Sequence, residues 1–414
     1  MVRTGPWQDV ARAVGLLAPD GGTRPTIFAE MSALALATGS VNLGQGFPDE
    51  DGPESVKQVA ARALLDGVNQ YPPGPGVPAL RQAVAAHQQR HYGIELDPDT
   101  EVLVTTGATE AIAAALLALV GPGEAVVTLE PFYDAYAAVV ALTGAELVTV
   151  PLVPSAEGFR PDLAALRAAA ARTGARVLLL NSPHNPTGSV LRREELAAVA
   201  SAAVAHDLLV VTDEVYERLT FDGAEHVPVA TLPGMRERTL TISSVGKTFS
   251  FTGWKIGWVS GPPDLVDAVR AVKQFLTYVS GAPFQPAVAH ALDLETTDGP
   301  DAGFVAGLAA SLARRRDLLV EGLEAAGLRT VPGEGTYFVV ADASDVVEAH
   351  GLADADALCR ALPDLCGVVA VPVSAFTVAG SPTREALRHH VRFTFTKSEA
   401  TLAEAVRRLA RLAP

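Results

Sequence analysis

Two lysines stand eight positions apart in a segment whose residue types suit phosphate and carbonyl chemistry. The strand-like run Thr239–Ile242 leads into two serines, a glycine and Lys247, and Lys255 follows. Small hydroxylated residues at the end of a buried strand, here including Ser244, can bind a phosphate group. A lysine held there out of water can lose its proton and attack a carbonyl carbon. The pattern therefore predicts a lysine bonded to an aldehyde beside a phosphate site, which is what a pyridoxal phosphate enzyme requires.

Lys247 has two other interpretations. A single lysine beside serines is usually a solvated surface residue. The tripeptide Gly246-Lys247-Thr248 also matches the end of a nucleotide-binding P-loop, but that motif needs a glycine five positions before Gly246. The residue there is Thr241, which lies inside the strand-like run, so the sequence excludes a P-loop.

Two further strand-like runs end in groups that could complete a cofactor site. Thr105 ends one run, and the backbone N–H groups of Gly107 and Ala108 open the next helix and would point at an anion. An ordinary helix start is the alternative. Asp213 ends another run, and a carboxylate there can keep a pyridine nitrogen protonated, so that the ring withdraws electrons. A helix cap is the alternative for Asp213.

Side chains near these strand ends could contact the rest of the same ring. Tyr216, three residues after Asp213, and Asn185, in a proline-fixed loop, could both bond its phenolic oxygen. An aromatic ring in Glu130–Asp134 could stack on a flat cofactor or simply pack in the core. Arg392 lies among apolar neighbours, and a buried arginine needs an anion. A substrate carboxylate would serve, with an internal ion pair as the alternative.

The composition limits the partners and the compartment that we expect. The chain has 414 residues, 49% of them hydrophobic, and a net charge of −15, which argues against nucleic acid or an anionic membrane as partner. Cys359 and Cys366 fit neither a metal site nor a disulfide framework, which favours reduced thiols in the cytoplasm. The apolar patch Val14–Ala18 is too short for a signal peptide, and Ala111–Val120 is too short to cross a bilayer. We expect a cytoplasmic protein without a metal ion.

The elements that must position these residues alternate regularly from residue 101 onward. Continuous Val/Leu runs suit strands buried on both faces, and helical stretches separate most of them. The pattern predicts an α/β fold with a seven-stranded, mainly parallel sheet, whose ligands bind at the carboxyl ends of the strands. The predicted strands are Glu101–Thr105, Ala125–Leu129, Glu146–Val150, Arg176–Asn181, Leu208–Thr212, Thr239–Ile242 and Ile256–Ser260. The predicted helices between them are Thr109–Leu119, Asp134–Leu142, Pro161–Ala170 and Arg193–His206.

The flanking segments suggest an arm and a second domain. We expect an N-terminal arm over residues 1–25, a large domain over residues 51–299, and a smaller α+β domain from residues 26–50 and 300–414. The smaller domain is predicted to contain the helices Thr26–Ala37, Gly303–Gly327 and Glu399–Leu412 and the strands Thr336–Val340, Val368–Val371 and Val391–Thr396. The large domain is predicted to add the helices Glu54–Leu65, Leu80–His91 and Asp264–Gln274.

Ten stretches of the chain, taken in order, resemble the class I aminotransferases of fold type I, which depend on pyridoxal phosphate. The resemblance is closest to the subgroup of kynurenine–oxoglutarate, glutamine, methionine and bacterial succinyldiaminopimelate transaminases. It extends from about Phe28 to the C-terminus, and the ordered set is far more specific than any single motif. The stretches are VNLGQGFPDEDGP, NQYPPGPG, VLVTTGATEA, EPFYDAY, NSPHNPTG, TDEVYE, ISSVGKTFSFTGWKIGW, GAPFQPAVA, GTYF and VRFTF.

The resemblance implies a role for each ring-binding residue. Lys247 would bond to the cofactor aldehyde and then move a proton between the substrate Cα and the cofactor. Asp213 would pair with the pyridine nitrogen. Tyr216 and Asn185 would bond the phenolic oxygen, and Tyr133 would stack on the ring.

The resemblance also implies how phosphate and substrate are held. Tyr71 would reach the phosphate from the other subunit, which makes the enzyme a homodimer with shared active sites. Within one subunit, the implied phosphate-binding residues are Gly107, Ala108, Thr109, Ser244 and Lys255. The implied substrate-binding residues are Arg392, Asn185 and the backbone of Gly46 for the carboxylate, with Phe28 and Tyr278 around the side chain.

The activity implied is a ping-pong transamination between an L-amino acid and a 2-oxo acid. The segments EMSALA, GVNQYPPGPG, PHNPTG and TDEVYE most resemble the succinyldiaminopimelate enzymes, which implies N-succinyl-LL-diaminopimelate with 2-oxoglutarate or glutamate, in lysine biosynthesis. The alternative is a broad glutamine, methionine or kynurenine-type transaminase with cysteine-conjugate β-lyase activity. A regulator that uses such a domain as a sensor would need a basic DNA-binding module, which this acidic chain has no room for.

Overall fold

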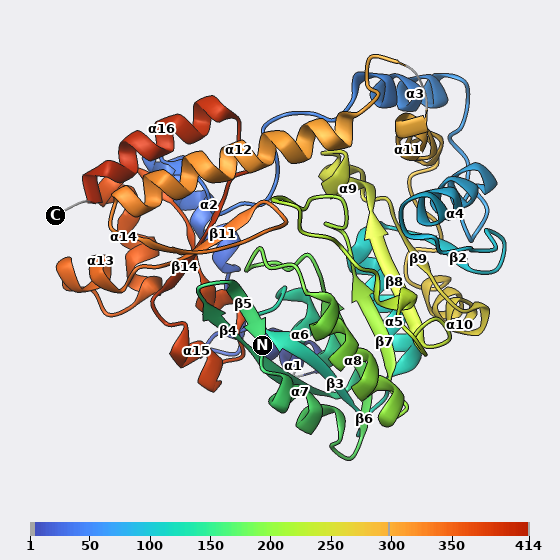
Figure 1. Cartoon of the computed structure of the whole chain (residues 1–414), viewed down its shortest axis with the longest axis horizontal. Helices are drawn as coiled ribbons and strands as arrows, with labels where there is room; N and C mark the ends of the chain where they lie inside the picture. Colours follow the sequence, from blue (N-terminus) through green and yellow to red (C-terminus); the bar gives the residue numbers. More distant parts are fainter. Residues whose placement is uncertain (1–4, 297–298, 413–414) are drawn as a thin grey trace.

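The computed structural model describes residues 5–296 and 299–412. Its largest sheet contains β2 (Val102–Thr105), β3 (Ala125–Glu130), β4 (Glu146–Ser155), β5 (Gly158–Pro161), β6 (Ala175–Asn181), β7 (Leu209–Asp213), β8 (Thr239–Ser244) and β9 (Gly257–Ser260). The spatial order is β2-β9-β8-β7-β6-β3-β4-β5 (Figure 1). Parallel pairing joins β4, β3, β6, β7 and β8, whereas β9 is antiparallel to both of its neighbours. The predicted mainly parallel α/β sheet is confirmed.

The predicted number of seven strands is wrong, because the sheet has an eighth strand at its edge. β4 continues to Ser155, five residues beyond its predicted end, and turns back into the four-residue strand β5. Gly158, with φ near 94°, pairs with Ser155 where the chain reverses. Glycine adopts this left-handed conformation at little cost. β5 carries too few apolar residues to stand out as a strand in the sequence.

Helices cover both faces of the sheet, which explains its unbroken apolar strands. In β6, Leu178 and Leu180 pack into one core with Leu196, whereas Val177 and Leu179 pack into the opposite core with Ile112. Such alternation is the pleat of a strand that is buried on both sides. The covering helices are α5 (Gly107–Leu119), α6 (Ala135–Thr143) and α10 (Pro263–Lys273) on one face and α7 (Leu163–Ala170) and α8 (Arg193–Ala205) on the other.

A smaller α+β region lies beside this sheet (Figure 1). Its antiparallel sheet has the order β10-β11-β14-β13, and a two-stranded parallel sheet joins β1 to β12. The strands are β1 (Val41–Asn42), β10 (Arg329–Val331), β11 (Phe338–Asp342), β12 (Val368–Val369), β13 (Val371–Pro372) and β14 (His390–Thr394). The helices are α2 (Ile27–Thr38), α12 (Phe304–Ala325), α13 (Ser344–Ala349), α14 (Ala355–Cys366), α15 (Pro382–Ala386) and α16 (Glu399–Leu409). One core contains residues of both α2 and the C-terminal elements, so these segments pack together although they lie far apart in the sequence.

Five helices and five 3₁₀ turns complete the described elements. They are α1 (Trp7–Ala13), α3 (Glu54–Leu65), α4 (Pro78–Tyr92), α9 (Val245–Thr248) and α11 (Phe284–Asp293), with 3₁₀ turns at Val229–Thr231, Thr252–Trp254, Leu294–Thr296, Val373–Phe376 and Ala410–Leu412. Within the segment predicted as an arm, α1 packs against α6, and residues 1–4 lie outside the described residues. Across residues 5–296 and 299–412, no helix has the length and apolarity needed to span a bilayer.

Strand register brings the predicted site residues to one edge. Asn181 ends β6 directly opposite Asp213, which ends β7. Ser244 ends β8 opposite Gly257, and Gly257 is also opposite Thr105 at the end of β2. The polar groups that follow these strands therefore converge at the carboxyl edge of the sheet.

Candidate active site

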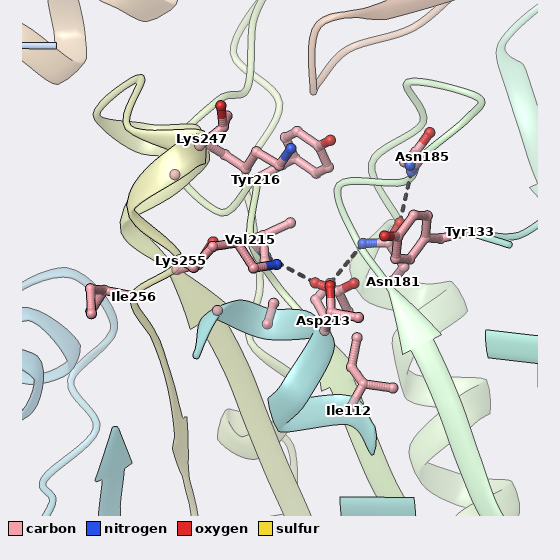
Figure 2. A pocket seen from close by; sticks show the side chains of 16 residues that line it. Ile112, Tyr133, Asn181, Asn185, Asp213, Val215, Tyr216, Lys247, Lys255 and Ile256 are labelled. Atoms are coloured by element: carbon pink, nitrogen blue, oxygen red, sulfur yellow. Dashed lines mark hydrogen bonds between the residues drawn. The ribbon is translucent and has the colours of Figure 1, made fainter. Parts of the chain in front are cut away.

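A cavity of about 170 Å³ opens at this edge of the sheet (Figure 2). Every predicted cofactor residue except Tyr71 lines it. A cavity of roughly 150 Å³ is large enough to hold benzene, so a single six-membered ring fits here. The predicted residues that line the cavity are Gly107, Ala108, Thr109, Tyr133, Asn185, Asp213, Tyr216, Ser244, Lys247 and Lys255.

Lys247 projects from the short helix α9, which begins directly after β8. Its Nζ lies 5.8 Å from the centre of the Tyr216 ring and 5.6 Å from that of Tyr337. Figure 2 shows the Lys247 side chain beside the Tyr216 ring. Burial disfavours the charged amine, but Tyr337, Tyr133 and Asp213 favour it more strongly, so the pKa of Lys247 is raised. The expectation that this amine can lose its proton and attack a carbonyl carbon stays a prediction.

Asp213 is a buried acid held by neutral donors. Tyr136 Oη donates to Asp213 Oδ2 at 2.7 Å, and the Val215 N–H donates to Oδ1 at 3.4 Å. Asn181 Nδ2 donates to the Asp213 carbonyl at 2.8 Å (Figure 2). Burial raises the pKa of Asp213 to about 6, although the bonds from Tyr136 and Val215 oppose the shift. A protonated ring nitrogen facing this carboxylate would lower its pKa again, because an adjacent cation favours the charged form.

The raised pKa of Asp213 gives a stability prediction for the cofactor-free protein. Between the ordinary pKa of 3.8 and the native value of about 6, the unfolded chain releases this proton and the native chain keeps it. Native stability is therefore lost as pH rises through this window, by about 3 kcal/mol in total. Asp213→Asn has no proton to lose. Urea unfolding from pH 4.5 to 7.5 should show the wild type falling relative to the variant, and parallel profiles would contradict the assignment.

The first turn of α5 forms a site for an anion. Gly107 has φ near 73°, and a Cβ on it would lie 3.3 Å from Lys255 Nζ. A Cβ on Gly257 would lie 2.7 Å from the Gly107 carbonyl carbon, so this close approach needs glycine. Lys255 forms no ion pair with a carboxylate among the described residues. Burial lowers the pKa of Lys255, and the nearby charge of Lys247 lowers it further. An ammonium, a helix N-terminus and the Ser244 hydroxyl meeting here suit a phosphate dianion.

Arg392 is a buried cation without an acidic partner. It lies mid-strand in β14, and its guanidinium donates to Asn185 Oδ1 at 3.0 Å and to the Gly44 carbonyl at 2.7 Å. No carboxylate of the described residues comes within ion-pair distance, which does not support the alternative of an internal ion pair. Burial lowers its pKa to about 10. A ligand carboxylate would supply the missing anionic partner.

Aromatic rings surround the Arg392 guanidinium. Its Cζ lies 4.0 Å from the centre of the Phe338 ring, 4.5 Å from that of Phe376 and 5.5 Å from that of Phe28. Phe28 is therefore one of three rings around Arg392, and its contact with a substrate side chain stays a prediction. Gly46 is close by, but its carbonyl accepts from Tyr337 Oη at 2.7 Å and makes no bond to Arg392.

Tyr71 and Tyr278 lie together, away from the cavity lining. Their ring centres are 5.6 Å apart in an edge-to-face contact. Tyr71 is 82% exposed and Tyr278 is 39% exposed. Within one chain, neither tyrosine is among the residues that line the cavity, and their predicted roles stay predictions.

Three residues in the site were missed by sequence reasoning. Tyr136 bonds Asp213, and Tyr337 faces Lys247. Asn181 Oδ1 accepts from the Asn185 N–H at 2.7 Å and so orients the Asn185 loop. Tyr136 lies in α6, three residues after Tyr133, which precedes that helix, and the two rings make an edge-to-face contact with their centres 5.7 Å apart. A second tyrosine this near to the predicted ring-stacking residue was a usable signal.

The donor set fits pyridoxal phosphate. The carboxylate of Asp213, the amine of Lys247 and the anion site at α5 line one cavity, as a ring nitrogen, an aldehyde and a phosphate require. Asn185 and Tyr216 also line this cavity and have the polar groups that would bond a phenolic oxygen.

Comparison with known proteins places the chain in a family. The family model for aminotransferase class I and II matches residues 38–409. A Mycobacterium tuberculosis protein named as a probable N-succinyldiaminopimelate aminotransferase is 57% identical over 393 residues, which cover 94% of this chain and 96% of that protein. The methionine aminotransferase of Escherichia coli is 39% identical over 394 residues, covering 95% of this chain and 97% of that protein.

Solved structures agree with these matches. The N-succinyldiaminopimelate aminotransferase from Mycobacterium tuberculosis superposes with a TM-score of 0.88 and 55% identity, covering 94% of this chain and 97% of that chain. An Escherichia coli methionine aminotransferase gives a TM-score of 0.87 and 36% identity, covering 99% of both chains. Sequence, fold and site geometry lead to the same conclusion: the chain belongs to the class I and II aminotransferase family and is a transaminase of fold type I.

Proposed function

We propose that this transaminase binds pyridoxal phosphate and moves an amino group between an L-amino acid and a 2-oxo acid by a ping-pong mechanism. The observation that carries the proposal is that Lys247, Asp213 and the α5 anion site line one cavity. Arg392, which has no acidic partner among the described residues, bonds Asn185 of the same cavity lining. The family depends on pyridoxal phosphate, and the donor set of this cavity suits that group.

The mechanism follows from what the side chains can do. When bound, pyridoxal phosphate supplies an electron-poor ring that stabilises negative charge at the substrate Cα. Arg392 binds the substrate carboxylate and orients the Cα–H bond. Lys247 Nζ takes the Cα proton and holds it for return, as general base and then general acid. The Asp213 carboxylate would keep the ring nitrogen of the bound cofactor protonated, and Tyr136 and Asn181 hold Asp213 in place.

We infer that the amino donor is N-succinyl-LL-diaminopimelate, with 2-oxoglutarate as acceptor and glutamate as product. Support comes from the 57% identity to the Mycobacterium tuberculosis protein, against 39% for a methionine aminotransferase and 36% for a human kynurenine–oxoglutarate transaminase. On the same grounds we place the enzyme in lysine biosynthesis, in the cytoplasm.

A half-reaction screen tests this substrate. Each amino donor is mixed with the cofactor-loaded enzyme without acceptor, and the conversion of bound cofactor to its amine form is followed. We expect the succinylated donor to react faster than glutamine, methionine and kynurenine. Faster reaction with methionine or glutamine would instead support the broad transaminase. Catalytic release of pyruvate and ammonia from a cysteine conjugate would reveal a β-lyase side activity.

Arg392→Gln should mainly weaken carboxylate binding. The variant keeps a donor near Asn185 but loses the charge, and a buried charge-assisted pair contributes about 2–5 kcal/mol to binding. KM for both the amino acid and the 2-oxo acid should therefore rise by about 100-fold. Steady-state kinetics with both substrates provide the measurement. Arg384→Gln, at an arginine that donates to the Ser374 carbonyl instead, is the control. An unchanged KM for both substrates in Arg392→Gln would contradict the role.

We also propose a homodimer with shared active sites. Large apolar side chains of two neighbouring loops are exposed in one chain: Tyr71 (82%), Phe275 (88%), Leu276 (47%) and Tyr278 (39%). Such a cluster is typical of a protein–protein interface. Sedimentation equilibrium should give a dimer. Mixing Lys247→Ala and Tyr71→Ala subunits should yield heterodimers with one restored site, and a fully active monomer would contradict the proposal.

A further inference from the structure

A buried lysine, Lys273, lies outside the cavity at the end of α10. It is only 2% exposed, and no carboxylate among the described residues lies within ion-pair distance of it. Burial lowers its pKa. Removing an ammonium from water is costly unless protein groups replace the water. The residues that replace it therefore indicate what this lysine does.

The Lys273 amine joins two loops that are far apart in the sequence. Its Nζ donates to the Gly74 carbonyl at 3.1 Å and to the Tyr278 carbonyl at 2.6 Å. The first acceptor belongs to loop 71–77, and the second belongs to loop 274–281. Tyr278 has φ near 64°, a left-handed conformation that a tyrosine rarely adopts without support.

Gln285 links the same two loops a second time. It is 1% exposed, and its Nε2 donates to the Ser280 carbonyl at 2.7 Å. Its Oε1 accepts from the Val77 N–H at 2.8 Å. Both ends of the buried amide are thus used to hold loop 71–77 against loop 274–281.

Glu110 connects this pair of loops to the α5 anion site. One carboxylate oxygen accepts from the Thr106 N–H at 2.6 Å, just before α5 begins, and the other accepts from the Thr277 hydroxyl. Thr106 and Thr277 also share a hydroxyl–hydroxyl bond of 3.1 Å. Hydrogen bonds therefore connect loop 71–77, loop 274–281 and the α5 anion site into one unit.

We propose that Lys273 is a positioning residue: it fixes loops 71–77 and 274–281 as one unit, so that Tyr71 is presented in the orientation that completes the phosphate site of the partner subunit. This inference rests on the proposed function, because it assigns Tyr71 to a second copy of this chain. Tyr71 packs edge-to-face against Tyr278, and Lys273 holds the Tyr278 backbone. The orientation of the Tyr71 ring therefore depends directly on Lys273.

A double-mutant cycle on cofactor affinity tests the proposal. The dissociation constant of pyridoxal phosphate is measured by quenching of tryptophan fluorescence for full-length wild type, Lys273→Met, Tyr71→Phe and the double variant. We expect each single variant to bind about tenfold more weakly, as expected when one hydrogen bond is lost. If Lys273 acts through Tyr71, the double variant should also be about tenfold weaker, not about 100-fold. Additive losses, or an unchanged affinity in Lys273→Met, would overturn the proposal.

Two further variants separate positioning from general stability. Lys273→Arg keeps cationic donors for both carbonyls and should restore most of the affinity. Arg270→Met makes the matching change on the exposed side of α10, where Arg270 pairs with Asp267, and should leave affinity unchanged. Loss of affinity in Arg270→Met equal to that in Lys273→Met would contradict a specific role.

Folding and dimerisation are checked in the same samples. If Lys273→Met fails to fold, the cycle is repeated with Gln285→Met, which removes the other link between the same loops. A wild type that is monomeric or binds no pyridoxal phosphate would defeat the proposed function itself. A dimeric, cofactor-binding wild type with an additive cycle would defeat only the role of Lys273.

Discussion

Lys247→Ala should lower kcat by about 10⁴-fold or more, because it removes both the covalent attachment point and the group that moves the Cα proton. Lys247 is the lysine whose amine faces the rings of Tyr216 and Tyr337. Lys255, the other lysine of the cavity lining, reaches over the first turn of α5 and is committed to the anion site. It should not substitute for Lys247.

The measurement is a single-turnover assay with amino donor, so that slow chemistry is separated from product release. Lys57→Ala, on α3, is a matched control, because Lys57 pairs with Asp51 and Glu54 at the surface. The control should retain wild-type rates. Lys247→Ala with wild-type turnover would remove the mechanism, whereas loss of activity in both variants would show a nonspecific effect.

Asp213→Asn should lower kcat by about 10²- to 10³-fold, on the scale of removing one preorganised electrostatic group from an active site. Asparagine keeps the shape of the side chain, but it cannot hold a proton on a ring nitrogen by charge. Cofactor binding should persist, because the anion site around Gly107 and Lys255 is untouched. The expected pattern is therefore a large loss in kcat with a small loss in affinity for pyridoxal phosphate.

A matched control for Asp213 is Asp207→Asn. Asp207 lies after α8, pairs with Arg238 at 3.0 Å, and has φ near 50°, a conformation that asparagine tolerates. Its activity should equal that of the wild type. If Asp213→Asn were equally active, the carboxylate would have no part in ring chemistry, and the charge at this strand end would need another explanation.

The sequence predicted the positions of most strands because their apolar runs are continuous. Val177–Leu180, for example, is apolar at every position, since β6 is buried on both faces. β5 was missed because a four-residue edge strand needs no such run. The predicted division into a large and a small domain stays a prediction, although one core does join α2 to the C-terminal elements.

The cavity residues were predictable because parallel strands place their carboxyl ends together. Asp213, Ser244 and Thr105 each end a strand at the same edge, so strand order alone brings their neighbours into contact. Protonation was not predictable in the same way. The pKa of Lys247 depends on Tyr337, which lies 90 residues later in the sequence, and on the balance between burial and nearby groups.

The contacts between loop 71–77 and loop 274–281 could not be predicted from the sequence either. Tyr71 and Tyr278 were predicted as binding residues without any link between them. The structure joins their loops through a lysine and a glutamine that carry no motif, Lys273 and Gln285. Such links depend on backbone carbonyls brought together by folding, which residue types do not encode.

The most direct test of the account is to find where pyridoxal phosphate becomes attached. The purified protein is incubated with the cofactor, reduced with borohydride to make the bond permanent, digested, and analysed by mass spectrometry. We predict one phosphopyridoxyl group per chain, on Lys247. A protein that takes up no label, or that is labelled on Lys255 with Lys247 unmodified, would contradict the central claim.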